Sequence, residues 1–220
     1  MDGRFLVGLI GSGISASRSP EIHEREGRAL GLQVFYHLMD LNAAPHDLPA
    51  LLNAAQTAGF AGVNITHPCK QAVIPLLDEL SDEALAIGAV NTVVFSQGRR
   101  RGHNTDCYGF AQSFRHGLAG ARLGSVLLVG AGGAGSAVAH AAIALGAGRL
   151  DVYDKDYARS ARLASKVGGH AVKELTPCDG LIHATPTGMA SHPGMVVPCA
   201  SCVPKCGWPS LSISRLKPSC

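Results

Sequence analysis

Short apolar runs alternate with longer stretches of helical pattern along most of the chain. Each run has the length of a β-strand and is bounded by glycine, proline or small polar residues, which is typical of buried strands. We expect strands at residues 5–10, 33–41, 62–66, 125–130, 149–154 and 179–185. We expect helices at residues 20–31, 45–59, about 107–119, 131–148 and 155–168, with a further helical stretch after Lys70. This alternation predicts an α/β fold with a mostly parallel sheet.

The segment 88–106 departs from this alternation. It predicts one strand, a glycine-bearing turn and a return segment in a loop. The run GRRRGH at 98–103 is expected at the solvated tip of that turn. Strand–helix pairs stand on both sides of the segment, so we predict two α/β domains with a boundary near residue 105.

The composition is that of a globular protein. Of 220 residues, 46% are hydrophobic and 16% are charged, which is enough apolar material for a buried core. The net charge of +3 is too small to favour nucleic acid as a partner. No apolar run approaches the roughly 18 residues of a membrane span, and the N-terminus lacks a signal-peptide pattern. We therefore expect a soluble cytoplasmic protein with reduced cysteines.

The sequence GAGGAG at 130–135 follows a predicted strand and opens a predicted helix. Gly130, Gly132 and Gly135 match the G-x-G-x-x-G pattern of dinucleotide-binding turns. The first glycine permits the tight turn, the second lets the backbone approach a diphosphate, and the third lets helix and strand pack closely. The helix start also offers free N–H groups to phosphates. We expect a dinucleotide site here, with Gly133 in the same loop.

Asp154 ends the next predicted strand, 19 positions after Gly135. A carboxylate there can accept hydrogen bonds from both ribose hydroxyls and would repel a 2′-phosphate, which favours NAD over NADP. Lys155 and Arg159 keep NADP open, because either side chain can reach a 2′-phosphate. The alternative is a closely packed strand–helix turn with an exposed aspartate and no nucleotide.

Short polar motifs stand on loops that follow the apolar strands of the first half. They are SASRSP at 15–20, NITHPCK at 64–70, GAVNT at 88–92 and NTDCYGF at 104–110. In this order, followed by the glycine loop and ATPTGM at 184–189, they resemble the motifs of the shikimate/quinate dehydrogenase family. The resemblance covers residues 5 to about 198 and is closest to the NAD-using quinate/shikimate branch.

The resemblance implies a substrate-binding and catalytic domain at 1–105 and an NAD(P)-binding Rossmann domain at 106–198. It implies an oxidoreductase that transfers a hydride between the cofactor and a ring hydroxyl of shikimate or quinate, in aromatic amino acid biosynthesis or quinate catabolism. It also assigns Thr185 to the cofactor. Two alternatives stay open: another two-domain Rossmann dehydrogenase, such as one acting on a folate, and a nucleotide-binding protein without catalysis. The oligomeric state stays open as well.

Lys70 and Asp106 are the candidate catalytic residues. Oxidation of a hydroxyl to a ketone needs a base, and a lysine near a carboxylate in a partly closed site can be tuned for that task. Asp106 would orient Lys70 and hydrogen-bond a substrate hydroxyl, and the family pattern places both against the reacting group. The alternative is a surface lysine–aspartate pair that contributes little.

Ser17, Ser19, Thr66 and Asn91 are the candidate substrate-binding residues. Hydroxyls at Ser17 and Ser19 can bind a carboxylate together with nearby backbone N–H groups, although Ser19 can also cap the helix that follows. By resemblance Thr66 and Asn91 contact the substrate, and Asn64 is a further amide. Thr66 also suits a strand, and an asparagine at a strand end is a common turn residue.

Four residues depart from the family pattern: His67, Cys69, Cys107 and His183. The two cysteines are expected to be small packing residues rather than nucleophiles. The ten histidines show no H-x-x-x-H or H-E-x-x-H spacing, so we expect no metal site.

Residues 199–220 do not continue the family pattern. Cys199, Cys202, Cys206 and Cys220 match no strong zinc spacing, and the segment shows poor helix or strand patterning. A doubly wound domain needs further strands here. A shifted reading frame permits a tryptophan, a tyrosine, a proline, a threonine and a leucine where family members have them. We therefore expect an out-of-frame translation from about residue 199, which leaves the chain truncated and its Rossmann domain incomplete.

Overall fold

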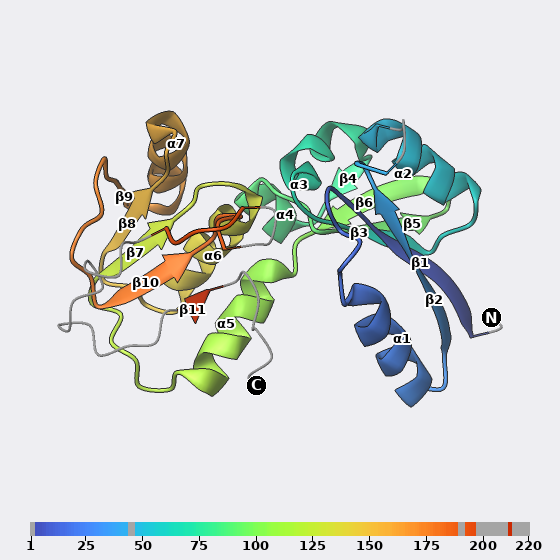
Figure 1. The fold of residues 1–220 in the computed structure, drawn as a ribbon, viewed down its shortest axis with the longest axis horizontal. Coiled ribbons are helices and arrows are strands. Elements are labelled where there is room, and N and C mark those ends of the chain that lie inside the picture. The colour runs from blue at the N-terminus through green and yellow to red at the C-terminus, as the bar shows by residue number, and fades with distance from the viewer. Residues whose placement is uncertain (1–2, 44–46, 189–191, 197–210, 213–220) are drawn as a thin grey trace. The chain divides into compact units, whose positions relative to one another are not determined.

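The computed structural model describes residues 3–43, 47–188, 192–196 and 211–212 (Figure 1). The chain divides into two compact units, Met1–Thr105 and Asp106–Cys220, called unit 1 and unit 2 below. Each unit holds its own sheet, and helices connect the parallel strands. The predicted α/β fold class is therefore confirmed.

Unit 1 contains a six-stranded sheet in the order β2-β1-β3-β5-β6-β4. Its strands are β1 (Arg4–Gly11), β2 (Gln33–Asp40), β3 (Gly62–Ile65), β4 (Glu79–Leu80), β5 (Thr92–Ser96) and β6 (Arg99–His103). Strands β1, β2 and β3 run parallel, whereas β5 is antiparallel to both β3 and β6. The carboxyl ends of the first three strands therefore lie at one edge of the sheet.

Helices cover both faces of this sheet (Figure 1). They are α1 (Ser19–Ala29), α2 (Leu48–Thr57), α3 (Cys69–Ala72), a 3-10 helix η1 (Ile74–Leu76) and α4 (Asp82–Ile87). Successive residues of β1 point to opposite faces, so Leu9 packs with Tyr36 while Ile10 packs with Leu52 of α2. The side chain of Asp47 starts α2 by accepting a hydrogen bond from Ala50 N–H at 2.9 Å.

The predicted glycine-bearing turn is present and contains Gly98, but the three arginines that follow lie on a strand and not at the turn tip, so that part of the prediction was wrong. The return segment is strand β6, and the turn consists of Gln97 (φ 51°) and Gly98 (φ 76°), which is typical of a two-residue hairpin. Arg100 ties the hairpin to α2, since its guanidinium donates to Gln56 Oε1 at 2.7 Å and Asn53 Oδ1 at 2.6 Å. These partners explain how an arginine-rich segment becomes a strand.

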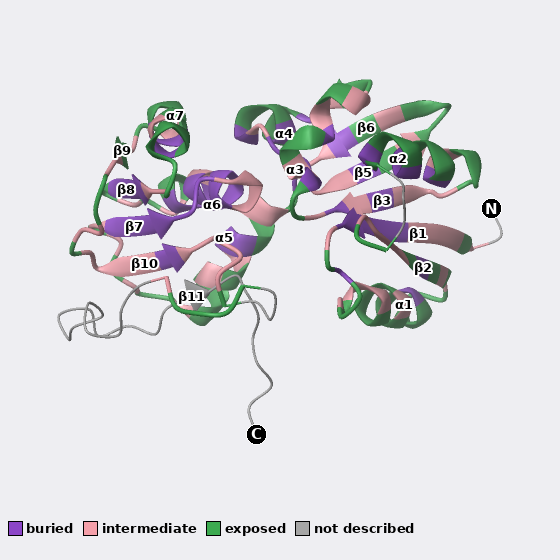
Figure 2. Cartoon of the chain, turned by 45° about the horizontal axis from the view of Figure 1, so that its top comes forward, coloured by how far each residue is buried: buried purple, intermediate pink, exposed green. Residues whose placement is uncertain are grey.

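Unit 2 contains a parallel five-stranded sheet in the order β11-β10-β7-β8-β9. Its strands are β7 (Val126–Val129), β8 (Leu150–Tyr153), β9 (His170–Ala171), β10 (Gly180–His183) and β11 (Leu211–Ser212). The helices α5 (Asp106–Gly117), α6 (Gly133–Ala144) and α7 (Tyr157–Val167) share one apolar cluster with β7 and β8. Every residue of β7 is buried, which identifies it as the centre of the unit (Figure 2).

A buried carboxylate stands in the middle of β8. Asp151 is 2% exposed and accepts hydrogen bonds from Arg149 Nε and Thr176 Oγ1, both at 2.8 Å. Burial raises its pKa, but these hydrogen bonds and the positive charges of Arg149 and His170 outweigh burial and hold the pKa below its ordinary value. The aspartate is therefore ionised at neutral pH and joins β8 to the loop that contains Thr176.

Most of the tail lies outside the described residues. The exception is the backbone of β11, which pairs in parallel with β10 through Ile182 and His183. The sequence analysis expected no strand there. The tail cysteines and the proposed change of reading frame fall on residues outside those described, so that origin stays a prediction.

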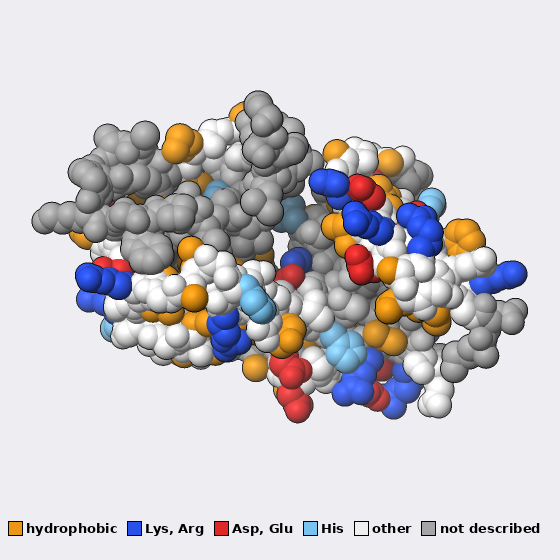
Figure 3. All heavy atoms as spheres, turned by 90° about the horizontal axis from the view of Figure 1, so that it is seen from below, with side chains coloured by type: hydrophobic (Ala, Val, Ile, Leu, Met, Phe, Trp, Pro, Cys, Tyr) orange, Lys and Arg blue, Asp and Glu red, His pale blue; other side chains and the backbone are white. Residues whose placement is uncertain are grey.

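None of the helices within the described ranges is long and apolar enough to cross a membrane. On the face that Figure 3 draws, positive and negative side chains are interspersed rather than gathered by sign, in keeping with the net charge of +3.

Candidate active site

Polar side chains collect at one end of the strands of the unit 1 sheet, where β1, β2 and β3 have their carboxyl ends. This end of the sheet is called the polar edge below. The parallel strands β1, β2 and β3 end at this edge. Strand β5 begins there, because Thr92 pairs with Asn64, and β6 ends there, because His103 pairs with Thr92. The predicted motifs follow or precede these strand ends, so residues far apart in the sequence come together.

A line of hydrogen bonds begins at the two predicted serines. The Ser17 hydroxyl donates to Ser19 Oγ at 3.0 Å, and the Ser19 N–H donates to Ser17 Oγ at 3.2 Å. The Ser19 side chain also acts on the Tyr36 hydroxyl, whose pKa it lowers. The Tyr36 hydroxyl donates to Asn64 Oδ1 at 2.7 Å.

The line continues across β3 and β5. Asn64 Nδ2 donates to Thr92 Oγ1 at 3.2 Å, and Thr92 Oγ1 donates to Asn91 Oδ1 at 3.0 Å. Asn91 then pairs with Thr105, accepting from its N–H at 3.1 Å and donating to its hydroxyl at 2.9 Å. The serines and Asn91 therefore belong to one network, in which each bond polarises the next. Their role in binding a substrate stays a prediction.

Tyr36 is the member of this network that the sequence analysis missed. Its side chain is 8% exposed and packs with Leu9 and Ile14. Burial raises the pKa of Tyr36 to about 12, although the Ser19 hydrogen bond opposes this rise. The hydroxyl is therefore protonated at neutral pH. A tyrosine within the apolar run 33–41 was the available signal, because a buried tyrosine hydroxyl needs a polar partner.

Ser19 does not cap α1, so that alternative was wrong. The helix begins at Ser19 itself, and the N-cap residue, Arg18, makes no side-chain hydrogen bond to the helix. Pro20 stands in the first turn, where its missing N–H does no harm. The Ser19 hydroxyl instead takes part in the polar edge.

Asp40 fixes the loop that leads from β1 to the serines. Its carboxylate accepts from the N–H of Gly13 at 2.9 Å and of Ile14 at 3.0 Å. The hydrogen bond from Asn42 N–H, followed by those from the loop, lowers the pKa of Asp40. The carboxylate therefore stays ionised while it holds this turn.

Thr66 stands directly after β3. Its N–H donates to Ile10 O at 2.9 Å, which extends the pairing of β3 with β1 by one residue. The peptide bond between His67 and Pro68, which follows shortly after, is cis. Thr66 thus lies at the polar edge, although its contact with a substrate stays a prediction.

Lys70 and Asp106 lie in different units. Lys70 is half-buried in α3, and its carbonyl accepts from Val90 N–H at 2.8 Å, which brings its backbone beside the segment that carries Asn91. Asp106 is half-buried, begins α5 and directly follows Thr105 of the network. The pairing of Lys70 with Asp106 stays a prediction.

The two cysteines of the motifs lie in apolar surroundings. Cys69 is 3% exposed in the unit 1 core, and burial raises the pKa of its thiol. Cys107 packs at the border of the unit 2 core. Within the part of the chain that the structure describes, no group of three or more His, Cys, Asp or Glu residues could hold a metal ion.

The glycine loop of unit 2 makes the close approaches that its motif predicts. Gly130 has a φ of 108°, a conformation that side chains rarely adopt, and follows β7 directly. A Cβ atom on Gly135 would lie 1.9 Å from the carbonyl oxygen of Gly130. The start of α6 can therefore pack on the end of β7 only without a side chain at position 135.

Gly132 differs from its neighbours because nothing lies within 4 Å of a Cβ placed there. It is the N-cap of α6, and Gly133 is the first residue of that helix. No side chain caps the helix, so the loop presents N–H groups beside an open space. This arrangement fits a dinucleotide diphosphate.

Asp154 follows β8 and is hydrogen-bonded to the glycine loop. Its Oδ2 accepts from Ala131 N–H at 2.7 Å, and its Oδ1 accepts from Asp156 N–H at 3.0 Å. A carboxylate accepts about four hydrogen bonds, so capacity for a ribose hydroxyl remains. A second carboxylate, that of Asp156, caps the nearby α7, since it accepts from Ala158 N–H at 3.0 Å.

Thr185 lies against the glycine loop from the side of β10. A Cβ atom on Gly130 would be 2.8 Å from Thr185 Cγ2 and 2.7 Å from Ala184 O. Thr185 Oγ1 is hydrogen-bonded to His183 Nε2 and accepts from Thr187 N–H at 3.2 Å. Burial lowers the pKa of His183, which favours its neutral form. The unusual histidine therefore holds a residue that the family pattern assigns to the cofactor.

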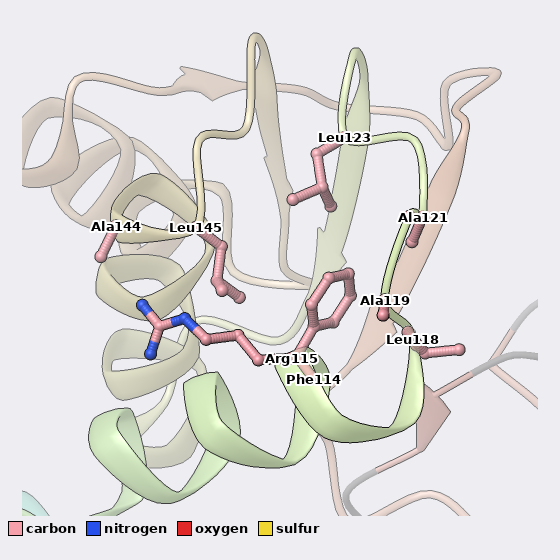
Figure 4. Close-up of a pocket in the computed structure, with 9 residues that line it drawn as sticks. Phe114, Arg115, Leu118, Ala119, Ala121, Leu123, Ala144 and Leu145 are labelled. Carbon is pink, nitrogen blue, oxygen red and sulfur yellow. The ribbon is translucent and has the colours of Figure 1, made fainter.

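A pocket elsewhere in unit 2 contains none of the predicted cofactor residues. It lies between the ends of α5 and α6 and the segment before β7, where Phe114, Leu123 and Leu145 turn toward one another (Figure 4). The glycine loop follows the opposite end of β7. The pocket is thus separate from the cofactor loop.

Comparison with known proteins places these features in a family. A family model for the shikimate dehydrogenase substrate binding domain matches residues 9–93. A shikimate dehydrogenase (NADP(+)) from Streptomyces avermitilis is 52% identical over 210 residues, covering 88% of this chain and 72% of that protein. A quinate/shikimate dehydrogenase (NAD(+)) from Corynebacterium glutamicum strain R is 44% identical over 225 residues, covering 94% of this chain and 79% of that protein.

Solved structures agree with these relatives. A quinate dehydrogenase from Corynebacterium glutamicum in complex with NAD aligns with a TM-score of 0.80 and 43% identity, covering 90% of this chain and 76% of that one. A shikimate 5-dehydrogenase from Thermus thermophilus, in complex with NADP(H) and shikimate, aligns with a TM-score of 0.73 and 36% identity, covering 83% and 69%. As its motifs predicted, the chain belongs to the shikimate dehydrogenase family.

Proposed function

We propose that the chain is a nicotinamide-dependent dehydrogenase that interconverts a ring hydroxyl of shikimate or quinate and the corresponding ketone. The observation that carries this proposal is the hydrogen-bonded line along the polar edge of unit 1, from Ser17 to Thr105. Relatives that cover most of the chain are named as shikimate and quinate/shikimate dehydrogenases. Family membership also favours this function over that of a folate dehydrogenase.

The polar edge suits a cyclic carboxylate that carries several hydroxyls. In the proposed complex, the Ser17 and Ser19 hydroxyls reorient so that their protons point to the carboxylate, and Thr66 contributes a further hydroxyl. Asn91 binds ring hydroxyls through an amide already oriented by Thr105. Because these side chains are held by one another before the substrate arrives, little conformational freedom is lost on binding.

The chemical step requires a proton acceptor at the reacting hydroxyl. Lys70 takes the hydroxyl proton as the hydride leaves, and the ammonium that results also stabilises the developing alkoxide character. Asp106 orients that ammonium and hydrogen-bonds a neighbouring hydroxyl. A bound nicotinamide dinucleotide supplies the hydride acceptor. In the reverse direction the Lys70 ammonium returns the proton to the carbonyl oxygen.

The cofactor is assigned as NAD, with NADP as the runner-up. Gly130, Gly132, Gly133 and Gly135 form the diphosphate loop, and Thr185 lies beside it. Two aspartates, Asp154 and Asp156, stand after β8, and their carboxylates would repel a 2′-phosphate bound beside them. Relatives of both cofactor types occur, so the assignment depends on these carboxylates rather than on overall similarity.

An initial-rate assay tests the proposal. Purified chain is incubated with each of four pairings, shikimate or quinate with NAD or NADP, and the absorbance of the reduced cofactor is followed. Turnover that requires both components supports the proposal. Cofactor binding without turnover on either substrate favours a nucleotide-binding protein without catalysis. Absence of both refutes the proposed function.

A further inference from the structure

Two neighbouring residues of α1 hold Tyr36 from different sides. The His23 ring stacks on the Tyr36 ring, with 4.8 Å between their centroids and 19° between their planes. Glu24 Oε1 accepts from the Tyr36 N–H at 3.2 Å. Strand β2 pairs with β1 alone among the described strands, so this N–H faces the free edge of the sheet, where Glu24 supplies its partner.

Tyr36 stands at the centre of the substrate-facing network. Its hydroxyl donates to Asn64 Oδ1 and is acted on by the Ser19 side chain, so Tyr36 stands between the proposed carboxylate site and the amides of β3 and β5. Tyr36 also belongs to an apolar cluster with Leu9 and Ile14. The stack with His23 holds the face of the Tyr36 ring, and the hydrogen bond to Glu24 holds the backbone from which the ring projects.

We propose that His23 and Glu24 are positioning residues for substrate binding, which act by holding the Tyr36 hydroxyl in line between Ser19 and Asn64. This inference rests on the proposed function, because it assumes that the polar edge binds the substrate. His23 is exposed at the surface, so its loss leaves no cavity in the core. The effect on substrate affinity is therefore separable from an effect on folding.

Without either support, the Tyr36 ring can move more freely. The side chains of Ser19 and Asn64 beside its hydroxyl are then less well positioned when a substrate binds. Stacked aromatic pairs contribute modestly, so we expect the dissociation constant of the substrate to rise about 3- to 10-fold in His23→Ala. His23→Phe keeps the stacked ring and should retain wild-type affinity. Glu24→Leu removes the acceptor and should also weaken binding, whereas Glu24→Gln keeps an acceptor oxygen and should not.

The experiment measures substrate binding and turnover separately. Isothermal titration with shikimate and with quinate, without cofactor, gives the dissociation constants of wild type and the four variants. Steady-state assays give kcat and KM, and thermal unfolding reports the fold. Arg25→Ala is the matched control, because it changes an exposed residue of the same helix. We expect His23→Ala and Glu24→Leu to raise the dissociation constant and KM while kcat and the melting temperature stay near wild type.

Four outcomes would overturn the inference. If His23→Ala binds as tightly as wild type, or if His23→Phe is as weak as His23→Ala, stacking on Tyr36 does not position the site. If Arg25→Ala weakens binding equally, the effect belongs to α1 as a whole. If wild type neither binds nor turns over shikimate or quinate, the proposed function fails and the inference fails with it, a result distinct from the first three.

Discussion

Replacing Gly135 by alanine should separate the two backbone segments that form the cofactor loop. A Cβ at this position would lie 1.9 Å from the carbonyl oxygen of Gly130 and 2.8 Å from its carbonyl carbon, whereas real Cβ atoms essentially never come within 3.0 Å of a neighbour. Both contacts are with backbone, so no side chain can rotate away. The start of α6 must therefore move from the end of β7 by about 1 Å.

The energetic result follows from two opposing effects. Overpacking of this kind costs about 3 kcal/mol, at the upper end of the usual range, because backbone has to shift. Replacement of a helical glycine by alanine returns about 1 kcal/mol. The net loss of about 2 kcal/mol corresponds to a fall of roughly 4–8 °C in the melting temperature of a chain of this size.

Gly132→Ala is the matched control for that change. Gly132 has φ −81° and ψ −167°, an extended conformation open to any residue, and nothing lies within 4 Å of a Cβ there. As an N-cap change it should cost about 1 kcal/mol or less. Its methyl group, however, would occupy the space into which a diphosphate has to fit.

Thermal unfolding by circular dichroism and titration with NAD distinguish the two variants. Gly135→Ala should lower both the melting temperature and the affinity for NAD, whereas Gly132→Ala should lower mainly the affinity. A melting temperature of Gly135→Ala within about 1 °C of wild type would refute the close approach of helix and strand. Wild-type NAD affinity in Gly132→Ala would refute the diphosphate site.

Three further substitutions test separate parts of the account. Burial raises the pKa of Asp151, but hydrogen bonds and nearby positive charges hold it below its ordinary value. The contribution of Asp151 to stability is therefore present at neutral pH and is lost as the pH falls through that lowered pKa. Asp151→Asn should therefore lower the unfolding free energy by about 1–3 kcal/mol at pH 7. This loss should shrink as acid titrates Asp151 in the wild type, and a loss that stays constant down to the pH at which the wild type unfolds would contradict this. Arg100→Met should lower the unfolding free energy by about 1–3 kcal/mol because it removes the hydrogen bonds to α2. Arg99 is exposed, so Arg99→Met should lower it by less than about 1 kcal/mol. Equal losses would be inconsistent with a strand held by Arg100. Two unit charges about 8 Å apart repel by about 2 kcal/mol at an effective dielectric constant of 20. Asp154→Asn should therefore raise the ratio of kcat/KM for NADP to kcat/KM for NAD by up to ~30-fold. An unchanged ratio would show that Asp154 does not determine which cofactor is used.

The local pattern of apolar and polar residues was sufficient to predict the longer strands and helices. The four-residue run of β7 and the glycine loop after it carry their structural requirements in adjacent residues, which is why the strand–turn–helix unit could be predicted. The two-residue strands β4 and β9 carry no periodicity, and they pair only because tertiary structure brings them to a sheet edge. Strand β6 was missed because its arginines mask an alternation in which Gly102 is buried and Arg99 and Arg101 are exposed.

The site divides in the same way. Ser17, Ser19 and Asn91 could be proposed because they belong to short motifs at strand ends. Tyr36 belongs to none, and its role depends on the distance from β2 to β3 across the sheet, which no local pattern contains. The stack with His23 likewise depends on how α1 packs. The sequence thus predicted which motif residues belong to the site, and the structure shows which side chains are in contact with one another.

The central claim is that this chain oxidises a ring hydroxyl with Lys70 as the base. The most direct test compares the initial rate of cofactor reduction, with saturating NAD and shikimate or quinate, in wild type and in Lys70→Ala. The account predicts clear turnover in wild type, a fall in kcat of about 10²- to 10⁴-fold in the variant, and NAD affinity that is nearly unchanged. A variant that keeps the wild-type rate would contradict the assignment of the base, and a wild-type chain that binds NAD without turnover would contradict the claim as a whole.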